Sequence, residues 1–337
     1  MRTMKTIPKS LRKINLTVFF ILVLLLSACS EDGIDTPENG KAVIPSSTLD
    51  TIVYAVVGND KIPIYLSIPK GCGENSYPAI VVMHGSDGMW ANHDPDKGTM
   101  SGQFNEWRDL FDEHCIIGAF VDSYSGRGIS TRTGKWTTAP DNFKISSQFI
   151  RSRDANAALA LLQNLKYTDG DAIVRPSDIG ILGFSDGATA VASTLYDTDK
   201  TPNDWEWTQN FNGKEYDESS GVLSPEPRPD VGFAAGVFYY GGSGGYDYWG
   251  SAICGPNALE GNIYRIYAPM LYQIPEVDEL TENTLCMFNV LKQKGDPVEL
   301  NLYEGAGHGF DFDDNGQSAL ARERTMAWFK EKLHMEK

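Results

Sequence analysis

The sequence has few histidines and cysteines, and it has no apolar run long enough to cross a bilayer. Only five histidines and five cysteines occur among 337 residues, and no cysteine pair has the spacing of a metal site. The longest apolar run, with its small flanking residues, covers residues 16–28. As a helix it would rise about 20 Å, against roughly 30 Å of hydrocarbon. We therefore expect neither a metal centre nor a permanent membrane-spanning helix.

Positive charge is also scarce, and part of it is confined to the N-terminus. The chain has 29 basic against 45 acidic residues, a net charge of -16. The first thirteen residues carry five of the positive charges, on Arg2, Lys5, Lys9, Arg12 and Lys13. Loss of residues 1–28 with these five charges would lower the net charge from -16 to -21. Such a chain does not attract nucleic acid through its overall field.

The N-terminal residues have the order of a secretory signal, with a basic stretch, an apolar stretch and the small residues Ser27 and Ala28. The string Leu26-Ser27-Ala28-Cys29 resembles the lipobox of bacterial lipoproteins, in which cleavage leaves an acylated cysteine at the new N-terminus. We therefore expect residues 1–28 to be a signal peptide and Cys29 to carry a lipid anchor that holds the protein to a membrane in the bacterial cell envelope. Residues 29–48 are polar and lack periodicity, which predicts a flexible tether.

Residues 49–337 are enough for one large α/β domain. Alternation of apolar and polar residues predicts a hairpin of strands 51–57 and 62–68. Strands and helices then alternate, as in a mostly parallel sheet with helices on both faces. The expected strands are 79–83, 116–121, 179–182, 232–240, 270–274 and 298–303, and the expected helices are 102–113, 145–165, 188–196, 282–294 and 318–333.

Two long insertions, residues 197–230 and 241–265, interrupt this alternation. Loops of this length are typical of binding lids, and a surface excursion is the alternative. Their aromatic residues, among them Trp249, either line a substrate pocket or pack the insertions onto the domain. Tyr124 and Arg127 follow a strand at the edge where such sheets bind ligands. They either contact substrate or, for Arg127, pair with a nearby aspartate.

Residues 183–187 form a G-x-S-x-G string between an expected strand and an expected helix, the context of a nucleophile elbow. Its central residue, Ser185, is the candidate nucleophile. Side chains at Gly183 and Gly187 would collide with the neighbouring strand and helix in so tight a turn. A serine hydroxyl is a weak nucleophile, so it requires a base and a group that orients the base.

The base and the acid should follow the serine in the chain, each after a later strand. Of the histidines after Ser185, only His308 lies in a loop directly after a strand, between Gly307 and Gly309. For the acid, Asp278 is the first choice and Glu276 the second. Asp278 alone would also fit a helix cap. The order Ser185, Asp278, His308 favours nucleophilic catalysis.

Acyl transfer also requires donors for the oxyanion. The N–H of Asp186 is one candidate, at the start of the helix that follows Ser185. The second would be the N–H of Gly85 or Ser86, in the loop after strand 79–83. The side chain of His84 is interpreted as structural.

From residue 51 to 335 the chain resembles the dienelactone hydrolase family of α/β-hydrolases. The matching segments are His84-Gly85, residues 121–128, Arg153-Asp154, the elbow, residues 269–271 with 276–278, and residues 307–310. The resemblance implies an α/β-hydrolase fold and hydrolysis without a cofactor. Ser185 stands where the name-giving enzymes have cysteine, which favours an ordinary carboxylic ester over an enol-lactone. The export signal and the aromatic insertions suggest an ester of a carbohydrate or an aromatic compound. Pro275 replaces a usual glycine, and the Asp186 side chain must point away from the oxyanion.

In the sheet that this resemblance implies, the second strand is antiparallel and lies beside the fourth. Cys72 follows the end of the second strand and Cys115 precedes the fourth. The resemblance therefore predicts a disulfide between them, which export would permit. Cys254 and Cys286 remain as a second pair.

Other interpretations remain open. One is a peptidase that resembles prolyl oligopeptidases, although the chain has no room for their propeller domain. Another is a surface lipoprotein that binds a ligand without catalysis, against which the intact nucleophile, acid and base argue. Residues 311–316 match the start of a calcium loop, but Arg322 occupies its last position, where a glutamate is required. We interpret this segment as a turn that caps the last helix.

Overall fold

The computed structural model describes residues 42–73, 76–131, 138–242 and 246–335. The expected signal peptide and Cys29 lie outside the described residues. Within the described part of the chain, the helices are all too short or too polar to cross a bilayer.

A sheet of eight strands forms the centre of the domain, in the order β12-β11-β10-β7-β4-β5-β3-β2. The strands are β2 (Asp50–Val57), β3 (Asp60–Ser67), β4 (Tyr77–Met83), β5 (Ile117–Val121), β7 (Val174–Phe184), β10 (Ala235–Tyr239), β11 (Met270–Pro275) and β12 (Val298–Tyr303). The neighbours from β12 to β5 run parallel. Only β3 opposes both of its neighbours, β2 and β5. The predicted opening hairpin and mostly parallel sheet are confirmed.

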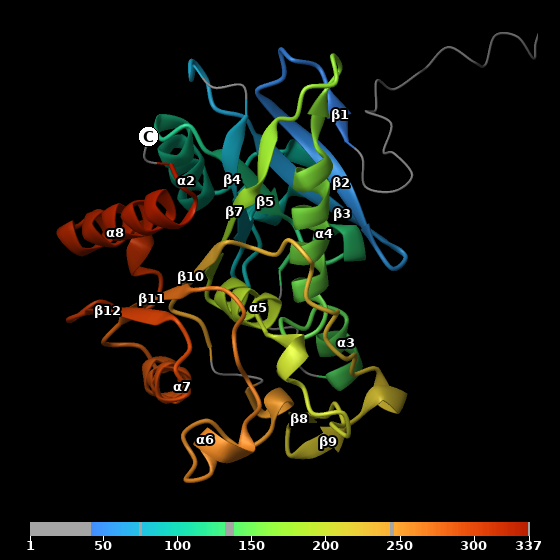
Figure 1. Ribbon diagram of the computed structural model, residues 1–337, viewed down its shortest axis with the longest axis vertical. Coiled ribbons are helices and arrows are strands. Elements are labelled where there is room, and N and C mark those ends of the chain that lie inside the picture. Colours follow the sequence, from blue (N-terminus) through green and yellow to red (C-terminus); the bar gives the residue numbers. More distant parts are fainter. Residues whose placement is uncertain (1–41, 74–75, 132–137, 243–245, 336–337) are drawn as a thin grey trace, which may run out of the picture. The chain divides into compact units, whose positions relative to one another are not determined.

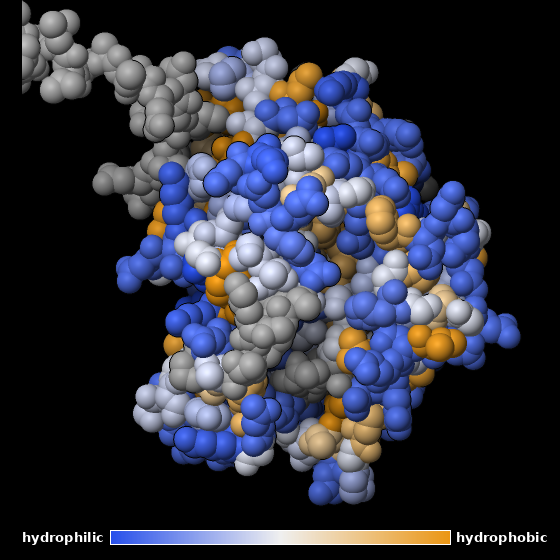
Figure 2. All heavy atoms as spheres, turned by 180° about the vertical axis from the view of Figure 1, so that it is seen from behind, coloured by the Kyte–Doolittle hydropathy of each residue, from blue (hydrophilic) through white to orange (hydrophobic). Residues whose placement is uncertain are grey.

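Helices cover both faces of this sheet (Figure 1). On one face lie α2 (Gly102–Glu113) and α8 (Gly316–Lys332), and on the other lie α4 (Arg151–Asn164) and α5 (Asp186–Thr194). The remaining helices are α3 (Ala139–Phe143), α6 (Ala258–Gly261) and α7 (Thr281–Gln293). Because both faces are covered, all seven residues of β4 are buried, which explains its continuous apolar sequence. The face of the molecule in Figure 2 is mostly hydrophilic, with scattered hydrophobic residues.

Helix α4 begins at Arg151, six residues later than the predicted start at Ile145. The segment before it forms turns, in which the N–H groups of Ile150 and Arg151 both donate to the carbonyl of Ser146. The Ser146 hydroxyl oxygen also accepts the backbone N–H of Gln148 at 3.3 Å. Serine side chains compete with the helix for backbone hydrogen bonds, which delays the start of α4.

The packed domain begins before residue 49, inside the segment predicted as tether. Strand β1 (Val43–Ile44) pairs in parallel with β6 (Lys166–Tyr167). Ala42 and Ile44 are buried against the core. The predicted start of the domain at residue 49 is therefore too late, because the short apolar stretch at residues 42–44 already packs on the domain.

The two insertions lie together near α3 at the bottom of Figure 1. The first contains the hairpin of β8 (Gln209–Phe211) and β9 (Lys214–Tyr216), and the second contains α6. Their aromatic rings pack on each other, with centroids 4.6 Å apart for Trp207 and Tyr248 and 5.1 Å apart for Tyr248 and Trp249. Trp249 is fully buried. Its proposed contact with substrate is therefore wrong, and it joins the insertions instead.

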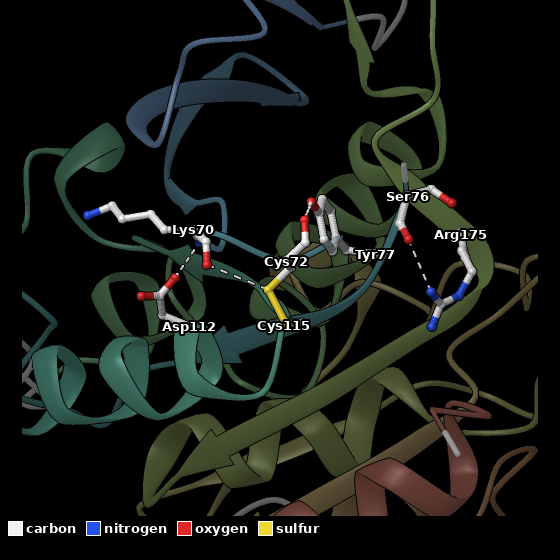
Figure 3. The surroundings of a disulfide bond; sticks show 7 residues. All are labelled: Lys70, Cys72, Ser76, Tyr77, Asp112, Cys115 and Arg175. Carbon is white, nitrogen blue, oxygen red and sulfur yellow. Dashed lines mark hydrogen bonds between the residues drawn. A yellow bond between two sulfur atoms is a disulfide. The ribbon is translucent and has the colours of Figure 1, made fainter. Parts of the chain in front are cut away.

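Disulfides connect Cys72 to Cys115 and Cys254 to Cys286, with Cα separations of 5.9 Å and 5.2 Å. The first closes the gap between the end of β3 and the start of β5, where Ser67 pairs with Gly118. Figure 3 shows that Asp112 lies beside this bond and accepts the N–H of Lys70 at 2.7 Å. The second bond ties the second insertion to α7.

Candidate active site

Ser185 lies in the turn between β7 and α5, at the carboxyl edge of the sheet. Its φ is 52°, a conformation that non-glycine residues rarely adopt. The Ser185 N–H donates to the carbonyl of Tyr239, at the end of neighbouring β10, at 3.0 Å. The sheet therefore holds the strained turn in place, with the serine beside a cavity.

The two glycines of the turn are required for close packing. A Cβ on Gly183 would lie 2.2 Å from the carbonyl oxygen of Gly187, and a Cβ on Gly187 would lie 2.1 Å from that of Met83. Both distances are impossible for real side chains. The predicted collisions are therefore confirmed, with α5 on one side and the end of β4 on the other.

His308 and Asp278 complete the arrangement around Ser185. His308 Nε2 lies 3.0 Å from Ser185 Oγ, and His308 Nδ1 lies 2.6 Å from Asp278 Oδ2. Asp278 follows β11, and His308 follows β12, so successive parallel strands bring these distant residues to one edge. With the Nδ1 proton donated to Asp278, Nε2 faces the serine hydroxyl as an acceptor.

Glu276 has a different role from Asp278. Its carboxylate accepts the N–H of Gly305 at 2.9 Å and so holds the loop that leads to His308. Asp278 serves two partners at once, because Oδ1 accepts the N–H of Leu280 at 3.0 Å while Oδ2 faces His308. Asp278 is not the N-cap of α7, because Leu280 holds that position without a side-chain cap bond; Asp278 instead holds the turn that precedes the helix.

The Tyr240 ring packs against the imidazole of His308, and Asp311 holds Tyr240 in place. The sequence did not predict this role for either residue. The Tyr240 ring lies 4.8 Å from the imidazole, and its hydroxyl donates to the Asp311 carboxylate. Gln103 and Trp107 donate to the same carboxylate at 3.0 Å each. Burial raises the pKa of Asp311 above its ordinary value. The only feature of the sequence that could have indicated this role of Asp311 is its position three residues after His308.

Three donors hold the carboxylate of Asp186, the residue that follows Ser185. Its carboxylate accepts from Arg151 at 2.6 Å, from Ser147 at 2.7 Å and from Tyr124 at 3.1 Å. Arg151 is fully buried. The negative charge beside the start of α5 is therefore paired, although Asp186 also lines the cavity beside Ser185.

His84 fixes the loop that follows β4. Its Nδ1 donates to the carbonyl of Gly85 at 2.7 Å, and its Nε2 accepts the N–H of Ser123 at 3.2 Å. Burial, followed by the charge of Arg151, lowers the pKa of His84 from 6.5 to about 4. The imidazole is therefore neutral at pH 7, and its structural role is confirmed.

Tyr124 and Arg127 do not line the cavity beside Ser185. The guanidinium of Arg127 binds Asp154 through two bonds of 2.8 Å and also contacts Asp60 at 2.8 Å. Tyr124 is buried and bonded to Asp186. Their proposed substrate contacts are therefore wrong. Both side chains are occupied by internal partners, and the alternative of an arginine–aspartate pair is the correct one.

The cavity beside Ser185 has a volume of about 550 Å³. Residues from α3, from the turns before α4 and from β8 surround it. The part played by β8 agrees with the expectation that the first insertion is a binding lid, whereas the part played by α3 and the turns was not predicted. Its polar lining includes Ser86, Asn142, Gln148, Gln209, Asn210 and Glu279. Phe143 and Phe211 contribute its aromatic part.

No cluster of metal-ligating side chains occurs in the part of the chain that the structure describes. The segment that resembles a calcium loop caps α8, where Asn315 accepts the N–H groups of Gln317 and Ser318. The interpretation of this segment as a capping turn is confirmed.

No protein-family model matches the sequence, and no curated protein is similar to it. Solved structures are similar in fold. Esterase 2 of Thermogutta terrifontis, phosphoramylated by tabun, has 16% identity and a TM-score of 0.51, over 85% of this chain and 96% of that one. A dienelactone hydrolase-like promiscuous phosphotriesterase from metagenomic libraries has 13% identity and a TM-score of 0.53, over 84% and 98%. These likenesses show that the domain has the α/β-hydrolase fold.

Proposed function

We propose that this protein is a serine hydrolase of the dienelactone hydrolase type that cleaves carboxylic esters through an acyl-enzyme on Ser185. The observation that carries the proposal is the continuous hydrogen-bonded line from Ser185 through His308 to Asp278. The elbow backbone supports it, because its strain serves to expose the Ser185 hydroxyl.

In the proposed reaction, Ser185 Oγ attacks the ester carbonyl carbon while His308 Nε2 takes the hydroxyl proton. Asp278 stabilises the resulting imidazolium. The proton then passes to the leaving alkoxide, and the alcohol departs. Water, deprotonated by His308, attacks the acyl-enzyme in the same way and releases the acid.

The oxyanion would be bound by the backbone N–H groups of Asp186 and Ser86. The first N–H groups of a helix have no acceptor within it, and Asp186 begins α5. The Gly85 carbonyl accepts from His84, so in the trans peptide the Ser86 N–H points in the opposite direction. Ser86 also lines the cavity, which favours it over Gly85.

We further infer export and attachment to a bacterial membrane through lipid on Cys29. The lipobox supports this proposal, and two disulfides suit an oxidising compartment. Mass spectrometry of the cell-extracted protein should find a lipid-modified Cys29 at its N-terminus. An unmodified chain that begins at Met1 would contradict the inference.

The esterase proposal is tested by rates with p-nitrophenyl acetate, a feruloyl ester, an acetylated sugar and a proline-containing p-nitroanilide peptide. We expect hydrolysis of esters without added metal or cofactor. Cleavage of the peptide in preference to every ester would contradict the proposal.

A further inference from the structure

A second cavity adjoins the one beside Ser185. Its volume is about 600 Å³, and it is formed by the first insertion, including the hairpin β8–β9, together with residues of the second insertion. Asn210, on β8, lines both cavities. The two hollows are therefore neighbours that share Asn210, and we refer to them together as the cleft.

The lining of the second cavity combines an aromatic ring with hydrogen-bond acceptors. The ring is that of Trp205, which is only partly buried. Carboxylates come from Asp204, Glu206, Glu215 and Asp247. None of the described residues that line this cavity is basic. Carboxylates accept hydrogen bonds and repel anions, so this lining suits a ligand that is rich in donors and carries no negative charge.

The side chain of Gln209 gives an independent indication of a bound ligand, because its oxygen lacks a hydrogen-bond donor. Its side chain is only 8% exposed and lines the cavity beside Ser185. Its amide nitrogen donates to Asp247 at 2.9 Å and to the Asn210 carbonyl at 3.2 Å. Its amide oxygen has no hydrogen-bond partner among the described residues. Buried polar atoms are rarely left unpaired. Its surroundings now enclose this oxygen, and a hydroxyl of a bound molecule would satisfy it once they shift to admit one.

We infer that the alcohol part of the ester is an uncharged oligosaccharide that extends from Ser185 across Asn210 into the second cavity. This inference rests on the proposed esterase function. Sugar hydroxyls donate to the carboxylates and to Gln209, and the apolar face of a sugar ring packs on Trp205. Each cavity alone is large enough for a drug-sized ligand, so the cleft accommodates more than one sugar unit.

The test compares acetyl esters of xylose and of xylotetraose with p-nitrophenyl acetate. We expect kcat/KM to rise about tenfold from the xylose to the xylotetraose ester in the wild type, because the longer chain reaches the second cavity. Trp205→Ala and Glu215→Gln should remove this rise. The matched control is Glu218→Gln, an exposed carboxylate on the same insertion that does not line the cavity. The Glu218→Gln variant should retain the rise in kcat/KM from the xylose to the xylotetraose ester.

Two further measurements test the effect of negative charge on the sugar and the binding of a sugar that carries no ester. An acetylated tetragalacturonide should react more slowly than the xylotetraose ester. Titration calorimetry should detect unacetylated xylotetraose binding to the wild type and not to Trp205→Ala. Equal rates for the two wild-type sugar esters, or a faster galacturonide, would overturn the inference. If no ester is hydrolysed although xylotetraose binds, the esterase proposal fails while the saccharide site stands.

Discussion

The buried guanidinium of Arg151 lies 2.6 Å from the carboxylate of Asp186, the residue that directly follows Ser185. Arg151 also donates to the carbonyl of His84 at 2.5 Å. One cation therefore connects the two loops that would supply the oxyanion donors. It also neutralises an acidic side chain that would otherwise oppose the developing negative charge.

Replacement of Arg151 by methionine should lower kcat about 100-fold, because the Asp186 charge is then unpaired beside the oxyanion. The double variant Arg151→Met/Asp186→Asn should recover part of this loss, since the charge is removed together with its partner. Steady-state kinetics of both variants check this, with circular dichroism as a control for folding. A double variant slower than Arg151→Met would exclude the electrostatic role.

Asp278→Asn should reduce kcat/KM far more than Glu276→Gln. Asp278 faces the imidazole at 2.6 Å, whereas Glu276 contacts only the N–H of Gly305. Loss of the acid of such a triad costs about 10⁴-fold in turnover. Glu276→Gln retains a carbonyl oxygen that can accept the same N–H, so kcat/KM should fall less than about tenfold. The opposite ranking would move the acid to Glu276.

The elbow and its partners could be predicted from the sequence because each lies directly after a strand. The glycines at 183 and 187 mark a turn that excludes side chains, and the chain order of Ser185, Asp278 and His308 follows the order of parallel strands. The distances between these residues follow from strand neighbours in the sheet, which the alternating pattern already indicated.

The remaining site residues depend on contacts that local patterns do not encode. Arg151 begins a helix and reaches Asp186, 35 positions away. The cavity lining combines α3 with a hairpin from an insertion that has no strong periodicity. For Tyr124 and Arg127, which follow a strand, and for Trp249, which lies in an insertion, the sequence left substrate contact open. Internal partners surround each of them instead. Only the folded arrangement distinguishes a ring that binds ligand from one that packs.

Acid should destabilise the protein through His84. Its pKa falls from 6.5 to about 4 on folding, so the folded state binds fewer protons than the unfolded state in this window. The resulting stability is present above pH 6.5 and is lost as the pH falls towards 4. The full loss corresponds to about 3 kcal/mol. Urea unfolding across this range should show a weaker pH dependence for His84→Asn than for the wild type. Identical pH profiles would contradict this.

The disulfide between Cys72 and Cys115 should stabilise the domain. It spans 43 positions, for which the chain-entropy model gives about 4 kcal/mol. The double variant Cys72→Ser/Cys115→Ser should therefore unfold at lower denaturant concentration than the wild type. Without denaturant it should retain esterase activity, because the bond lies at the opposite edge of the sheet from Ser185. Free thiols at both positions of the natively purified protein would show that the bond is absent.

Covalent labelling shows directly whether Ser185 is the nucleophile. A fluorophosphonate probe reacts with an activated serine and leaves a stable adduct that peptide mass spectrometry locates. We expect one adduct, on the peptide that contains Ser185, and none in Ser185→Ala, which should also lose at least about a thousandfold in ester turnover. An adduct on another residue, or labelling that persists in Ser185→Ala, would show that Ser185 is not the nucleophile.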